Sequence, residues 1–372
     1  MTQLTESGTK RGRPVTKAAI YLRRYRWFTR SIVATVVGLA LMGSGSASAA
    51  NGSQQITKSQ WKQAITQLRT PSSGCFHASY PKVEWLKSAC KVAPKMAFQP
   101  ATVGNGDDWA TETSGTLSQV QGEFQYVSPG ISESGPLNGG GPLLPNTYSL
   151  QINSQFFNDP PKCSGAATPS NCDGWEQFVY SSDGNSIFIQ YWLIDYDTTC
   201  PSGWNTHGSD CWINGNAANY VGGTIPASEF HELYFVGFAT TGNDTVELGT
   251  EANGEYGVTA VSTAESTNSL DLADYWNTAE FNVVGDAGGG QATFSAGSTL
   301  WVQTLLVGDT SESAPACEIA GTTGETNNLS LVRTHYEPGT YNYPISVFKE
   351  TNDSSTVINP PSATCSTAPG PS

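Results

Sequence analysis

Carboxylates and carboxamides on strand faces are the side chains of this sequence with the clearest capacity for chemistry. In AEFNVVGD (279–286), Glu280 and Asn282 alternate with apolar residues, and in YSLQINS (148–154) Gln151 and Asn153 do the same. A carboxylate can act as a general base, and a primary amide can donate a hydrogen bond to an oxyanion. The alternative is that these are ordinary solvent-facing residues of half-buried strands.

Aromatic residues surround a third candidate, Glu176, in GWEQFVY (174–180). Glu176 follows Trp175 and shares its strand face with two aromatic residues, so desolvation would raise its pKa. Trp175, Trp192 and Trp276 are candidate walls of a substrate groove, together with Asn153 and Asn282 as polar contacts. The alternative for each tryptophan is a place in the hydrophobic core.

Other familiar chemical sites are absent from the sequence. It contains no nucleophile elbow, paired zinc-binding histidines or phosphate-binding glycine loop in a strand–helix context. The histidines show no metal-ligand spacing, and they are His77, His207, His231 and His335. We therefore predict no metal and no cofactor. Calcium binding is an open alternative at the acid-rich turns 195–197 and 243–251, although neither has the spacing of an EF-hand loop.

The order of three segments resembles the eqolisins, the fungal glutamic peptidases. These segments are LQIN (150–153), GWEQFVY and W..AEFNVVGD (276–286), and the resemblance covers Tyr148 to Val307. It implies a catalytic glutamine at Gln151, a catalytic glutamate at Glu280, and a two-sheet antiparallel sandwich of legume-lectin type. It also implies an acid-active endopeptidase with a polypeptide substrate. Gly285 departs from the pattern, because the family has an acidic residue there.

Other assignments remain open at this point. The neprosin-type glutamic peptidases use two glutamates, and their pattern would make Glu176 the partner of Glu280. A glycosidase could use the same pair, with carboxyl groups ~5–5.5 or ~6.5–9.5 Å apart. A non-catalytic carbohydrate-binding sandwich is the third alternative, since fold alone does not decide function. Convergence of Gln151 and Glu280 would favour the peptidase, whereas a flat row of aromatics would favour binding.

Many short strands separated by Gly, Asn and Asp turns predict an all-β fold. We expect an antiparallel two-sheet β-sandwich, legume-lectin-like or jelly roll, with a small N-terminal helical segment. Expected strands lie at 148–153, 175–180, 186–196, 230–238, 244–250, 255–261, 279–286, 299–307 and 343–350. Apolar spacing predicts a helix across Ile56–Leu68, a second short helix over Tyr80–Cys90, and one helical turn near Leu270–Trp276.

Charge divides the chain into three parts. Residues 1–49 join a basic stretch, a short apolar run and Ala47-Ser48-Ala49, which predicts a secretion signal. Residues 50–115 form a basic helical segment and linker, where 50–95 hold seven basic residues and one acid. Residues 116–372 form the acidic sandwich, and 96–332 hold one basic residue, Lys162, against 27 acids. The opposite charges make the basic segment a candidate intramolecular pro-segment, with a permanent helical cap as the alternative.

The acidic body and the cysteines limit the partners and the compartment. Acidic surfaces repel phosphate backbones and anionic lipids, so we predict no nucleic-acid and no membrane partner, and a monomer. An even number of cysteines in an exported chain predicts disulfides and a secreted location, extracellular or periplasmic. Their order suggests the local pairs 75–90, 163–172, 200–211 and 317–365.

Overall fold

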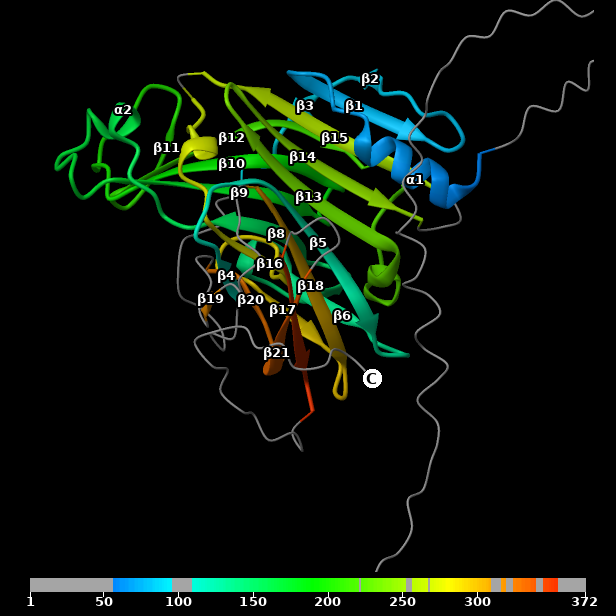
Figure 1. The fold of residues 1–372 in the computed structure, drawn as a ribbon. Coiled ribbons are helices and arrows are strands. Elements are labelled where there is room, and N and C mark those ends of the chain that lie inside the picture. The colour runs from blue at the N-terminus through cyan, green and yellow to red at the C-terminus, as the bar shows by residue number, and fades with distance from the viewer. Residues whose placement is uncertain are drawn as a thin grey trace, which may run out of the picture. The chain divides into compact units, whose positions relative to one another are not determined.

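The computed structural model describes residues 56–95, 109–220, 222–251, 256–266, 268–308, 316–318, 324–338 and 344–353. Within these ranges the protein is an all-β sandwich with few helices, as the sequence predicts (Figure 1). The predicted signal at 1–49 lies outside the described residues.

One large sheet has nine described strands. In spatial order they are β2 (Leu86–Ser88), β1 (Gly74–Ser79), β15 (Gly257–Ala264), β14 (Asn243–Thr250), β13 (Leu233–Thr240), β5 (Leu117–Val127), β18 (Thr299–Gly308), β22 (Pro344–Thr351) and β21 (Ser330–Pro338). All their pairings are antiparallel. We refer to this as the first sheet.

The second sheet carries the candidate site. Its order is β11 (Asn205–His207), β12 (Asp210–Asn219), β10 (Ser186–Ile194), β9 (Asp173–Ser181), β8 (Ser149–Ser154), β16 (Thr278–Val284), β4 (Ala110–Glu112) and β19 (Ala316–Glu318). The short strand β3 (Lys91–Val92) pairs with β12. A small sheet contains β20 (Thr326–Asn327), β17 (Gln291–Phe294), β6 (Glu133–Pro136) and β7 (Leu143–Pro145).

The core lies between the two large sheets because each contributes one apolar face. Strand β10 contacts β14 and β15, and β16 contacts β5 and β18. Alternate residues enter this core, as Leu150 and Ile152 do from β8 and Phe281 does from β16. Gly122 of β5 is required there, because a Cβ atom at this position would lie 2.2 Å from the Phe281 ring.

The helices are short and peripheral. They are α1 (Lys58–Gln67), α2 (Pro160–Cys163) and the 3₁₀ turns η2 (Leu137–Gly139), η3 (Ala227–Glu232) and η5 (Leu272–Asp274). Helix α1 confirms the predicted amphipathic helix, since Trp61 and Ile65 pack on Tyr234 and Val236 of β13. Turn η5 confirms the predicted helical turn near 270–276. Within the described residues, no helix is both long enough and apolar enough to cross a lipid bilayer.

The prediction of a second helix over Tyr80–Cys90 is wrong. Strand β1 ends just before Tyr80, and β2 then returns against it with Cys75 opposite Ser88. Pro81 disfavours a helical conformation at Tyr80, and pairing with β15 satisfies the backbone of β1. Strands β1 to β4 therefore pair within the large sheets, although they lie in residues predicted to form an appendage and linker.

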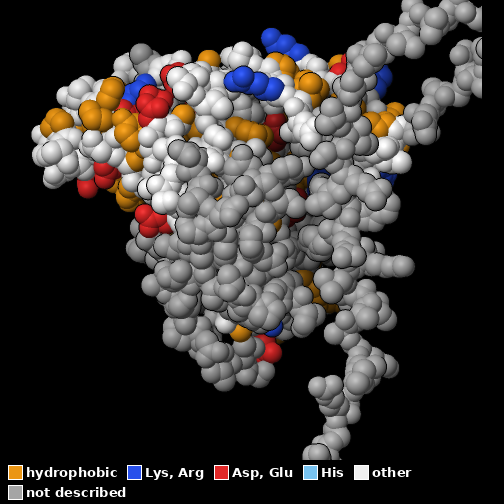
Figure 2. Space-filling model, in the orientation of Figure 1, with side chains coloured by type: hydrophobic (Ala, Val, Ile, Leu, Met, Phe, Trp, Pro, Cys, Tyr) orange, Lys and Arg blue, Asp and Glu red, His pale blue; other side chains and the backbone are white. Residues whose placement is uncertain are grey.

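Basic side chains are concentrated in this early segment. Figure 2 shows Lys and Arg side chains along the upper edge of the view, where Figure 1 places β1 and β2. Helix α1 binds the acidic first sheet through Lys58 with Glu251 and through Lys62 with Glu123, the latter at 3.5 Å. The basic segment is therefore docked on the acidic body by charge as well as by apolar packing.

Three of the four predicted disulfides are present. They are Cys75–Cys90, Cys163–Cys172 and Cys200–Cys211, and each joins cysteines close in sequence. The fourth predicted pair, Cys317 with Cys365, lies outside what the structure describes, because Cys365 and the side chain of Cys317 are not part of it.

Candidate functional site

Strands β8 and β16 place the two main candidates on one face of the second sheet. They pair antiparallel, with Glu280 opposite Asn153 and Asn282 opposite Gln151. Because side chains alternate across a strand, Gln151, Asn153 and Glu280 point away from the core that receives Leu150 and Ile152. Gln151 and Glu280 are diagonal neighbours, which lie ~7–8 Å apart in a sheet. The structure therefore brings these two predicted residues together.

Amide side chains connect the two candidates. Asn153 Nδ2 donates to Glu280 Oε2 at 3.1 Å. Gln177 Nε2 of β9 donates to both Asn153 Oδ1, at 3.1 Å, and Gln151 Oε1, at 3.0 Å. These bonds fix the orientation of the Gln151 amide, whose Nε2 donates one hydrogen bond to Ser149 Oγ at 2.9 Å. A primary amide has a second N–H, which is the group an oxyanion would need.

The chain of amides continues across the sheet. Trp192 Nε1 lies between Gln177 Oε1, at 3.0 Å, and Gln190 Oε1, at 2.7 Å. Gln190 donates to Asn214 of β12, whose Nδ2 donates to the carbonyl of Pro94 at 2.7 Å. We call this set the amide row, and its members are Glu280, Asn153, Gln151, Gln177, Gln190 and Asn214. The row crosses five adjacent strands, from β16 to β12.

The central part of the amide row is shielded from solvent. Glu280 is 2% exposed, Gln151 and Asn153 are each 1% exposed, and Gln177 is fully buried. Buried polar side chains are costly unless they are paired, and the mutual hydrogen bonds meet this requirement. They also hold the carboxylate and the amides in one geometry, as a preorganised site requires.

Glu176 lies on the opposite face of the sheet. It pairs with Tyr191, which belongs to the core between the sheets, whereas the next residue, Gln177, belongs to the amide row. Burial raises the pKa of Glu176 well above its usual range, and repulsion from Asp244 of β14 adds to this effect. Glu176 and Glu280 therefore do not converge, and the pairing of these two glutamates predicted from the neprosin pattern is wrong.

The predicted aromatic walls divide between the two faces. Trp175 and Trp192 pack together on the face of the amide row, with ring centroids 5.9 Å apart, and Trp212 joins them. Trp276 instead packs on Phe178 in the core and donates from Nε1 to the Thr278 carbonyl at 2.9 Å. Its prediction as a substrate contact is therefore wrong.

Asn282 has a different partner from the one its strand position suggests. Although it is opposite Gln151, its Nδ2 donates to Glu350 Oε2 of β22 at 3.3 Å. Its side chain thus links the second sheet to the first, and Asn282 is not a member of the amide row.

Two further acids, not expected from the sequence, lie near the end of β16. Burial raises the pKa of Glu133 to about 8 and that of Asp286 to about 6. Ser181 Oγ donates to Asp286 Oδ1 at 2.7 Å, which favours the ionised form but does not offset burial. Both carboxyl groups are therefore protonated in acidic solution. Their ionisation at higher pH lowers the stability of the folded protein.

The described residues offer no obvious metal centre. Across the ranges that the structure covers, no three His, Cys, Asp or Glu side chains are grouped so that they could hold a metal ion. The acid-rich turns at 195–197 and 243–251 do not form such a group among these residues.

Comparison with known proteins assigns no family. No protein-family model and no curated protein match the chain. Among solved structures, it is similar to full-length tailspike protein 2 (TSP2, ORF211) from Escherichia coli O157:H7 bacteriophage CAB120. That likeness has 11% identity and a TM-score of 0.26, and it covers 65% of this chain and 27% of the tailspike, so the chain spans about a quarter of that protein.

Proposed function

We propose that this protein is a secreted, acid-active endopeptidase of the glutamic type, with Glu280 as general base and Gln151 as oxyanion donor. The observation that carries the proposal is the placement of Gln151 and Glu280 on adjacent strands, on one face, joined through Asn153 and Gln177. The resemblance of the surrounding segments to the eqolisins adds support. The three disulfides are typical of proteins that leave the cytosol.

The residues suggest a direct hydrolysis. Glu280 would take a proton from a water molecule as the water oxygen bonds to the peptide carbonyl carbon. The second N–H of Gln151 Nε2 would donate to the resulting oxyanion. Glu280 would then pass the proton to the departing nitrogen as the C–N bond breaks, so the carboxylate is regenerated. Asn153 holds Glu280 in place, and Gln177 holds Gln151.

The burial of the amide row gives the proposal a second part. A polypeptide cannot reach side chains that are only 1–2% exposed, so we take the described form to be latent. The basic segment reaches the face of the amide row at its end, where Ala93 packs on Val179 and Phe188 and the Pro94 carbonyl accepts a hydrogen bond from Asn214. We expect full activity to follow an acid incubation, and the basic segment is the candidate pro-segment.

The test is cleavage of denatured casein by the purified full chain from pH 2 to 7, after incubation at pH 3–4. Glu280→Gln should abolish cleavage. Glu176→Gln is the matched control, because it makes the same chemical change on the other face of the same sheet, and it should retain cleavage. The proposal is wrong if folded, acid-treated wild type cleaves nothing, or if Glu280→Gln cleaves as well as Glu176→Gln.

The glycosidase alternative is not supported by this geometry. A glycosidic bond needs two carboxyl groups on either side of it. Glu176 and Glu280 lie on opposite faces of the second sheet, so they cannot flank one bond.

A further inference from the structure

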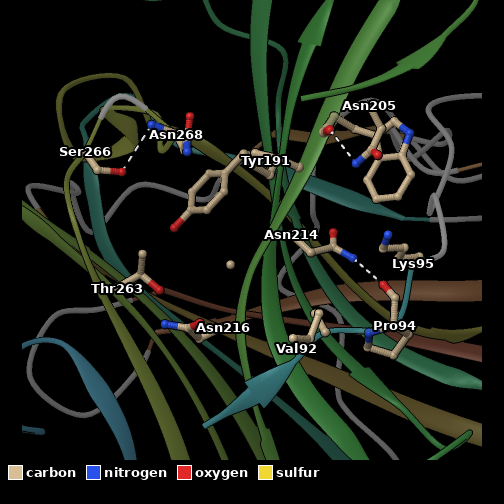
Figure 3. Close-up of a pocket in the computed structure, with 14 residues that line it drawn as sticks. Val92, Pro94, Lys95, Tyr191, Asn205, Asn214, Asn216, Thr263, Ser266 and Asn268 are labelled. Carbon is tan, nitrogen blue, oxygen red and sulfur yellow. Dashed lines mark hydrogen bonds between the residues drawn. The ribbon is translucent and has the colours of Figure 1, made fainter. Parts of the chain in front are cut away.

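A cavity of about 340 Å³ lies beside β12, at the far end of the amide row from Glu280. Its lining comes from β10, β11 and β12, from residues 92–95, and from the end of β15 with the segment that follows it (Figure 3). Asn205 and Asn216 in its wall are exposed, so it opens to solvent. Four strand spacings of ~4.8 Å separate β12 from β16, which places the cavity ~19 Å from Glu280.

A β-bulge shapes the cavity. Gln190 pairs with Asn214 and Phe188 pairs with Ala217, so Gly215 and Asn216 together face the single residue between them on β10. A Cβ atom at Gly215 would lie 3.4 Å from Thr263 Oγ1, in ordinary contact. The missing side chain at Gly215 therefore leaves space that a larger residue would fill. Bulges of this kind often re-aim side chains next to binding sites.

The floor of the cavity holds two buried hydroxyl groups that interact only weakly with the rest of the protein. Tyr191 is 1% exposed, and neither its hydroxyl nor Thr263 Oγ1 makes a hydrogen bond of normal geometry. The two hydroxyls face each other closely enough to interact. Burial raises the pKa of Tyr191, and this contact opposes that effect slightly. In Figure 3, Tyr191 extends toward Thr263, with Ser266 and Asn268 on one side and Asn216 on the other. Buried polar groups are almost always satisfied, so a ligand that hydrogen-bonds to these hydroxyls would complete the site.

The lining chemistry indicates the class of ligand. The polar groups of the walls are neutral amides and hydroxyls set among apolar side chains, and of the described lining residues Lys95 alone is charged. Such groups both donate and accept, as vicinal hydroxyls of a sugar do. The indole of Trp212 adds an apolar surface of the kind that packs on a sugar ring.

We propose that this cavity binds a neutral saccharide, with Tyr191 and Thr263 as the floor, Asn216 and Asn268 as the walls, and Gly215 providing the space. The site is independent of the proposed peptidase, because none of these residues belongs to the catalytic pair. If the protein binds sugar but cleaves no peptide, the saccharide site is supported and the peptidase proposal is wrong. If it cleaves peptides but binds no sugar, the peptidase proposal is supported and the saccharide site is wrong.

The test is binding of soluble neutral tetrasaccharides to the full chain, measured by saturation-transfer NMR and by tryptophan fluorescence. The probes are β-1,4-glucose, β-1,3-glucose, β-1,4-mannose and N-acetylated β-1,4-glucosamine oligomers, with a tetragalacturonate as the anionic comparison. At least one neutral probe should bind with a Kd below ~1 mM. The anionic probe should bind more weakly than the best neutral one.

Variants locate the binding. Tyr191→Phe removes one hydrogen bond and should weaken binding ~5–10-fold. Gly215→Ala should weaken it less than Gly215→Val, which fills more of the floor. Asn219→Ala is the control, because Asn219 is an exposed residue of β12 outside the cavity. Absence of binding to every neutral probe by folded protein would overturn the proposal, as would binding that neither Tyr191→Phe nor Gly215→Val changes.

Discussion

The buried acid Glu247 gives a prediction whose size follows from the structure. Glu247 lies in β14, is 4% exposed and accepts a hydrogen bond from Thr70 Oγ1. Burial raises its pKa from 4.5 to about 7, in spite of that hydrogen bond. The folded state therefore holds the proton more tightly than the unfolded state does. This stabilisation is complete below pH 4.5 and is lost as the pH rises through 7.

The expected magnitude follows from the two pKa values of Glu247. A carboxyl whose pKa rises from 4.5 to about 7 on folding weakens the fold by ~3 kcal/mol between pH 4 and pH 8. Glu247→Gln has nearly the same shape, can still accept from Thr70 and does not titrate. The variant should match wild type at pH 4 and exceed its free energy of unfolding by ~3 kcal/mol at pH 8.

The assay is urea unfolding at pH 4, 6 and 8, followed by tryptophan fluorescence. Glu84→Gln is the control, because it makes the same chemical change at an exposed site. The reasoning is refuted if wild type and Glu247→Gln differ by the same amount at pH 4 and pH 8, or if wild type is the more stable of the two at pH 8.

Three further predictions follow from other contacts. Trp192→Phe removes the N–H shared by the two glutamines of the amide row, and urea unfolding should show a loss of ~1–3 kcal/mol; no loss would mean that the row does not stabilise the fold. Because the pKa values of Glu133 and Asp286 are raised to about 8 and about 6, thermal scans should give a higher Tm at pH 4 than at pH 8, and the opposite order would contradict those values. Acid processing should produce a new N-terminus after Cys90, because the basic segment contains both Cys75 and Cys90 and a cut between them leaves the fragment tethered; N-terminal sequencing after incubation at pH 3–4 checks this, and active protein that still starts before Cys75 would contradict it.

The strands were predictable where one face of a strand meets the core. In β8, β9 and β16 apolar residues alternate or cluster strongly enough to mark each strand from sequence alone. Strand β1 lacked such a signal, because its stability comes from pairing with β15, about 180 residues later in the chain. A helix predicted from local spacing over Tyr80–Cys90 could not anticipate that partner.

The candidate site was predictable in part for the same reason. Alternation within β8 and β16 placed Gln151 and Glu280 on polar faces, but only the register showed that these faces coincide. Gln177 was missed because its role depends on β8 and β10 on either side of it. Glu176 carried a usable signal, since its face is shared with Phe178, and Phe178 is buried in the core.

Interdependence of Gln151 and Glu280 tests the central claim most directly. Rates of casein cleavage would be measured at the pH optimum for wild type, Gln151→Leu, Glu280→Gln and the double variant. If both residues act on one substrate, Gln151→Leu should lower the rate ~10²–10³-fold in wild type, and it should change nothing further in the Glu280→Gln background. Wild-type cleavage by folded Glu280→Gln, or independent and additive losses from the two changes, would contradict the account.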